Sequence, residues 1–192
     1  MNQKQVTEMI KIDENRHAKI HTRQIKVTTY DTDEDAIIVE GSLKDDRLQT
    51  VHRAAGRIVP PGTVHHMIIR MKVTRPRMII EDIDVAMPTV PHEECPQTRN
   101  SLEPVIGMRI SAGFTNRVKD LVGGAKGCAH LVALLVSMAS ASVQGAWAAM
   151  SRHPEQPSGY AVKAVNAIVD TCRVWRRDGP KLKEYRENLK DH

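Results

Sequence analysis

The fold is decided by three consecutive stretches: QIKVTTY at residues 24–30, DTDED at residues 31–35 and AIIVEGSL at residues 36–43. The first and third are rich in apolar and β-branched residues that alternate with polar ones, which is typical of half-buried strands. The middle stretch is short and acidic, as a solvated turn requires. Together they predict a β-hairpin.

Two more strands are expected after Pro60-Pro61-Gly62. They cover residues 64–73 and 77–87, with a turn at Thr74-Arg75-Pro76 between them. Four strands joined in this way form an antiparallel sheet with one face free for helices.

The second half of the chain changes to a helical pattern. Helices are expected over residues 116–122, 128–150 and 160–175, because Gly123-Gly124 ends the first and prolines separate the other two. Strands first and helices afterwards predict an α+β fold, in which an antiparallel β-sheet from the N-terminal half is packed by helices from the C-terminal half.

The length of 192 residues suits one compact domain. We expect a single α+β domain over residues 16–179, with residues 1–15 and 180–192 as loosely attached termini.

Residues 131–150 carry no formal charge and are long enough to resemble a membrane span. The segment SMASASVQG at residues 137–145 is small and polar, so we expect a buried core helix and no membrane partner. The N-terminus lacks the apolar stretch of a secretory signal, and three cysteines cannot form a closed disulfide framework. The expected location is therefore cytoplasmic.

The basic residues do not indicate a nucleic-acid partner. Lys and Arg outnumber Asp and Glu by 28 to 23, but they are scattered, and aromatic residues make up only 3% of the chain. A nucleic-acid-binding surface combines a basic face with interleaved aromatic residues. The sequence leaves a homo-oligomer open.

The segment VGGAKGCAHL at residues 122–131 is the strongest candidate for a functional site. It lies where the long helix begins, and the free N–H groups of a helix start favour anions and thiolates. Cys128 and His130 diverge within a regular helix, but they converge if Cys128 still belongs to the loop. The residues that could cradle a phosphorylated cofactor are Gly123, Gly124 and Gly127, although the segment is no Walker motif.

A zinc or iron–sulfur site is the chemistry that the cysteines suggest, since a Cys₃His set is typical of both. The candidate metal ligands are Cys95, Cys128, His130, Cys172 and His66. The rings of His65 and His66 face opposite sides of a strand, so only one of them can join a given site. No close Cys-x-x-Cys pair is present, and Cys95 or Cys172 alone is typical of a buried filler.

Several motifs resemble, in their order, successive signatures of one bacterial family. They are His21-x-Arg23, Glu40-Gly41-x-Leu43-x-Asp45, Gly62-x-x-x-His66-Met67-x-x-Arg70, Pro91-x-x-x-Cys95, the Gly107 to Gly113-Phe114 segment, and Gly123-Gly124-x-x-Gly127-Cys128-x-His130-Leu131. Over residues 21–179 the chain is similar to the family catalogued as domain of unknown function 2889. It has Ala129 and Ala133 where that family usually has Thr and Glu. The resemblance implies a fold and a site, but no reaction.

The order of the elements also resembles, more distantly, that of iron–sulfur cluster scaffold proteins. In that comparison Cys95 follows the sheet, Gly127-Cys128 opens a helix of small residues, and Cys172 comes late.

Three functions fit this sequence. The first is a metal-binding protein or enzyme with a Cys/His site at the start of the long helix, where the third strand meets Gly127-Cys128. The second is a non-catalytic accessory or binding protein, in which the glycines and small residues serve packing or a partner. The third is a metal-free thiol enzyme with Cys128 as nucleophile and His130 as base.

Overall fold

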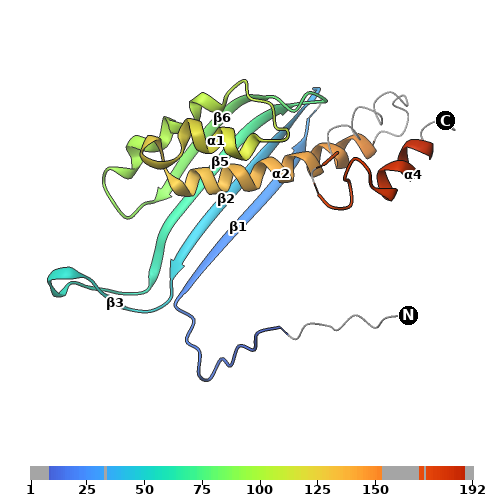
Figure 1. The fold of residues 1–192 in the computed structure, drawn as a ribbon. Coiled ribbons are helices and arrows are strands. Elements are labelled where there is room, and N and C mark those ends of the chain that lie inside the picture. The colour runs from blue at the N-terminus through green and yellow to red at the C-terminus, as the bar shows by residue number, and fades with distance from the viewer. Residues whose placement is uncertain (1–8, 33, 153–168, 171, 189–192) are drawn as a thin grey trace.

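The computed structural model describes residues 9–32, 34–152, 169–170 and 172–188. Its main element is a four-stranded antiparallel sheet in the order β1-β2-β5-β6. The strands are β1 (His21–Asp31), β2 (Ala36–Arg47), β5 (Gly62–Thr74) and β6 (Ile80–Thr89). Helices from the C-terminal half cover one face of this sheet, which confirms the expected α+β fold (Figure 1).

Alternation along β2 decides which side chains meet the helices. Val39 and Leu43 are fully buried, whereas Glu40 and Ser42 are partly exposed. Gly41 belongs to the buried series, and a Cβ at this position would lie 2.6 Å from Cγ of Met138, so the glycine permits close approach of the helix. Because successive side chains point to opposite faces, Asp45 follows in the same buried series.

Helix α2 (Ala129–Ser151) runs lengthwise along the covered face and contacts β1, β2 and β5 (Figure 1). Its fully buried side chains include Leu131, Leu134, Leu135 and Met138. The segment Ala129–Met150 is long and apolar enough to cross a membrane by length and composition. Since its apolar side packs against the sheet, α2 instead has the surroundings of the core helix of a soluble domain.

Two shorter helices connect the sheet to α2. The 3₁₀ helix η2 (Cys95–Val105) packs against β6, and α1 (Phe114–Val122) packs against η2 and α2. α1 starts two residues earlier than the sequence suggests and ends at the expected residue. The backbone N–H of Gly123 closes its last turn by donating to the carbonyl of Lys119.

Some elements differ from the expectation. The connection between β2 and β5 contains a small hairpin of β3 (Val51–His52) and β4 (Ile58–Val59), which projects from the body of the molecule (Figure 1). The helix expected over residues 160–175 lies outside the described residues up to 168, and residues 169–170 and 172–175 form turns and bends.

A loosely attached tail is expected from residue 180, and the structure describes this segment up to residue 188. It contains α4 (Pro180–Asn188), in which Leu182 is fully buried. The ring of Tyr185 lies 6.1 Å from that of Trp147 in α2 and 6.0 Å from that of Trp175. Leu182 and Tyr185 thus attach α4 to the folded part. Two such residues in a highly charged segment are too few to form a recognisable helical pattern in the sequence.

Candidate functional site

A buried carboxylate lies at one end of the sheet. The side chain of Asp45 in β2 is 3% exposed, and both of its oxygens accept hydrogen bonds from Arg23 in β1. Nε and Nη2 of Arg23 each lie 2.7 Å from a carboxylate oxygen, and the two residues are paired across the strands. This bidentate contact compensates the charge of Asp45 and fixes the orientation of its carboxylate.

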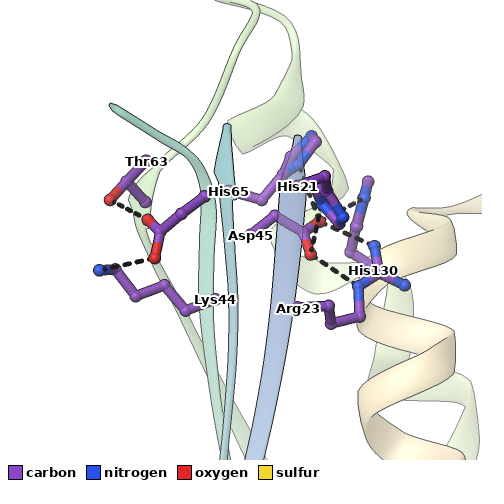
Figure 2. Close-up of polar contacts among 8 residues, drawn as sticks. His21, Arg23, Lys44, Asp45, Thr63, His65 and His130 are labelled. Atoms are coloured by element: carbon purple, nitrogen blue, oxygen red, sulfur yellow. Dashed lines mark hydrogen bonds and ion pairs between the residues drawn. The ribbon is translucent and has the colours of Figure 1, made fainter. Parts of the chain in front are cut away.

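Two imidazoles lie against the same carboxylate, one from a strand and one from a helix. Nδ1 of His65 is 3.2 Å from Oδ2 of Asp45, and Nε2 of His130 is 3.4 Å from that oxygen. The two rings stack with their centroids 3.8 Å apart. Figure 2 shows His21 and Arg23 from β1, His65 from β5 and His130 from α2 converging on Asp45.

Strand β5 contains a β-bulge beside these residues. Asp45 pairs with His65, but Asp46 pairs with Thr63, so Val64 is an extra residue in β5. A bulge of this kind bends a strand and redirects neighbouring side chains, and such bulges are frequent next to active sites. Here it lies one residue from the histidine that faces Asp45.

Asp45, His65 and His130 could hold a metal ion. One ligand atom from each lies within 4.8 Å of the others, and no other such group occurs among the described residues. Two ligand atoms separated by 3.2–3.4 Å and each bonded at about 2.0–2.1 Å to one ion would subtend an angle of about 99–116° at that ion, a range that includes the tetrahedral value. The hydrogen bonds of Arg23 take one lone pair of each carboxylate oxygen and leave another on Oδ2.

Burial sets the protonation state of the two histidines. It lowers the pKa of His65 below 6.5, with Arg23 and His92 adding to the effect and Asp45 opposing it. Burial also lowers the pKa of His130, followed by repulsion from His65. The hydrogen bonds from Arg23 lower the pKa of Asp45 below 3.8. At neutral pH the site therefore presents a carboxylate and two neutral imidazoles, the forms that bind metals.

Cys128 lies beside the other nitrogen of the His130 ring. It is the N-cap residue of α2 with extended backbone angles, and its Sγ is 3.7 Å from Nδ1 of His130. The thiol therefore still belongs to the loop, which is the condition under which the two side chains can converge. Nδ1 faces the thiol and Nε2 faces Asp45, so His130 connects Cys128 to the carboxylate.

The other expected metal ligands lie elsewhere. His66 points to the opposite face of the sheet from His65, where its Nε2 lies 3.3 Å from Oγ of Ser42. Cys95 is the first residue of η2, and neither it nor Cys172 contributes a ligand atom to the group described above. The expected Cys₃His set is therefore not assembled within the described part of the chain.

The length of α2 explains why Cys172 cannot reach Cys128. The carbonyl of Cys172 accepts a hydrogen bond from the backbone N–H of Trp175. The rings of Trp175 and Trp147 both contact the ring of Tyr185. Trp147 is nineteen residues along the chain from Cys128, which corresponds to about 28 Å at 1.5 Å per helical residue. Cys172 thus lies near the other end of α2 and is exposed.

Close packing favours glycine at positions 123 and 127, and backbone conformation favours it at position 124. A Cβ on Gly123 would overlap the carbonyl of Lys119, and one on Gly127 would lie 2.7 Å from the carbonyl of Val122. Gly124 has a φ of 61°, a left-handed conformation that favours glycine. Together they form the tight connection, including η3 (Gly124–Lys126), that places Cys128 and His130.

Sequence reasoning missed Asp45, His65, Arg23 and His21 as members of a site. The alternation of β2 contained a usable signal, because Asp45 has the same phase as Val39 and Leu43, and a carboxylate on a buried face requires a partner. Nε2 of His21 lies 3.5 Å from Oδ1 of Asp45. The predicted hairpin places β1 beside β2 without fixing the register, and nothing in the sequence alone places α2 beside that carboxylate.

Comparison with known proteins gives a family but no activity. No curated protein matches the chain, and no solved structure matches it. A family model matches residues 21–144, about two thirds of the chain. This range contains every residue of the Asp45 cluster, which consists of Asp45, Arg23, His21, His65 and His130. The chain therefore belongs to the family described as "Protein of unknown function (DUF2889)".

Proposed function

We propose that this protein binds a divalent transition-metal ion through Asp45, His65 and His130. One observation carries the proposal. Two imidazole nitrogens, Nδ1 of His65 and Nε2 of His130, lie 3.2 and 3.4 Å from the same buried oxygen, Oδ2 of Asp45. The ligand set replaces the cysteine-rich set expected from the sequence and keeps only His130 from it.

The chemistry of the donors supports a mononuclear site. Two imidazoles and one carboxylate suit zinc and the first-row metals that prefer nitrogen and oxygen, whereas an iron–sulfur cluster is held mostly by thiolates. Three protein ligands leave at least one coordination position for water or substrate, which is typical of catalytic rather than structural sites. Cys128 would then contact the outer nitrogen of His130, as groups around metal ligands commonly do.

Metal analysis tests the proposal. Protein purified anaerobically without chelators should contain about one equivalent of metal per chain, and His65→Ala should reduce metal affinity about tenfold or more. His66→Ala is the matched control, since it removes the neighbouring imidazole from the opposite face. Metal-free wild-type protein, or equal metal content in the two variants, would exclude this site.

A second candidate is a metal-free thiol enzyme, and the 3.7 Å contact between Cys128 and His130 favours it. Cys128, His130 and Asp45 are connected in series, as nucleophile, base and orienting carboxylate are in thiol enzymes. Cys128 should then be alkylated faster than the exposed Cys172. Competitive alkylation with peptide mass spectrometry measures this ranking, and a slow Cys128 in metal-free protein would leave the accessory-protein interpretation.

The cellular location that goes with these functions is the cytoplasm. Support comes from the burial of α2 against the sheet and from three free cysteines. Fractionation with a membrane-protein control tests it.

A further inference from the structure

The charge of the Asp45 cluster does not balance once a metal ion is present. The described ligand group contains one carboxylate, Asp45, and two imidazoles. Arg23 already compensates that carboxylate through two hydrogen bonds of 2.7 Å. A divalent ion would therefore add two positive charges that no group within the cluster compensates, and uncompensated charge is costly in a partly buried site.

Neighbouring acidic groups do not supply the missing charge. Asp46 follows Asp45 in the strand but faces the opposite side of the sheet, where it accepts a hydrogen bond from Thr63 and pairs with Lys44. Among the described residues whose charges shift the pKa of the two imidazoles, Asp45 is the only carboxylate, and it acts beside Arg23 and His92.

Further groups that attract an anion surround the cluster. The Arg23 side chain is 40% exposed, and two of the five N–H donors of its guanidinium group donate to Asp45. His21 lies on the outer side of the carboxylate and is 52% exposed. His130 is in the first turn of the 23-residue helix α2, whose positive end adds to the same potential.

We infer that the open coordination position of this site takes a small oxyanion, of which a carboxylate is the simplest example. The inference rests on the proposed function, because the metal ion creates the excess charge. An anion bonded to the metal would compensate that charge where the protein does not, and Arg23 would hold it by long-range attraction while still orienting Asp45. The substrate or regulator of the site is accordingly anionic.

Cobalt-loaded protein tests the inference, since the visible absorption of Co²⁺ reports its coordination. The protein is first checked for Co²⁺ binding and then titrated with acetate and with acetamide, which has nearly the same shape but no charge. Acetate should change the spectrum saturably and bind at least about tenfold more tightly than acetamide. Arg23→Gln should retain cobalt and weaken acetate about tenfold, and Arg23→Lys should restore much of the affinity.

Arg70→Gln is the control for net charge, because Arg70 pairs with Glu40 on the exposed face of the sheet and should not alter acetate binding. Failure of Co²⁺ to bind would overturn the proposed function and this inference with it. Bound Co²⁺ with no preference for acetate over acetamide would overturn the inference alone. Equal effects of Arg23→Gln and Arg70→Gln would also overturn it, because the attraction would then not be local.

Discussion

The rings of His65 and His130 stack with centroids 3.8 Å apart and planes inclined by 28°. One ring comes from the third long strand and the other from the first turn of α2. The stack therefore fixes the start of the helix against the sheet at the point where both imidazoles meet Asp45. It makes the candidate site part of the contact between the two layers of the fold, so variants in the site are expected to affect stability as well as binding.

Loss of the Arg23 side chain should destabilise the protein. Arg23→Gln leaves the buried Asp45 carboxylate without its charged partner, and we expect a loss of about 2 kcal/mol in the free energy of unfolding. The loss is smaller than for a fully buried pair because Arg23 is 40% exposed. Urea unfolding at pH 7 measures it. Arg70→Gln breaks the exposed pair with Glu40 and should cost at most about 1 kcal/mol; equal losses would contradict the prediction.

The stability of the metal-free protein should fall as the solution is acidified below pH 6.5. Because burial lowers the pKa of His65 and His130 below 6.5, the unfolded chain binds protons there before the folded chain does. Each histidine can contribute up to about 1.4 kcal/mol per pH unit between its unfolded and folded pKa, and nothing above that range.

Urea unfolding of chelator-treated protein at several pH values between 5 and 8 measures this dependence. Replacing both histidines by Asn should flatten the profile in that range. The single variant His66→Asn should keep it, since His66 lies on the opposite face. An unchanged profile in the double variant would assign the dependence to other groups.

The small side chains of α2 should resist enlargement only where they face the sheet. Ala146 is 5% exposed and belongs to the core, so Ala146→Leu should overpack the contact with the sheet and cost about 1–3 kcal/mol. Ala148 is exposed, and Ala148→Leu should change stability by no more than about 0.5 kcal/mol. Thermal unfolding compares the two. Similar melting temperatures would mean that this part of α2 does not pack as described.

Helix α4 should contribute to stability. Leu182 is fully buried, so Leu182→Ala should cost about 2 kcal/mol or more. The neighbouring Lys183 is exposed, and Lys183→Ala should be nearly neutral. Chemical unfolding followed by tryptophan fluorescence suits this pair, because Trp147 and Trp175 both lie beside Tyr185. A neutral Leu182→Ala would show that the helix is detached in solution.

The sequence by itself determined the local elements of this protein. The alternation over residues 24–43 predicted β1 and β2, and the Gly123-Gly124 break predicted the end of α1 before a long helix. These predictions succeeded because strand period, helix period and glycine conformation depend on neighbours along the chain. The family resemblance over most of the chain was also confirmed, since it rests on residues in sequence order.

Only the tertiary structure decided which side chains share the site. The register of β1 against β2 places Arg23 opposite Asp45, and the pairing of β2 with β5 places His65 rather than His66 opposite that residue on the covered face. The packing of α2 then brings His130 to the same carboxylate. Strand register and helix packing depend on contacts between residues far apart in the chain, which no local pattern encodes. For this reason the closeness of Cys128 and His130 could be predicted from the sequence, but the side chains around them could not.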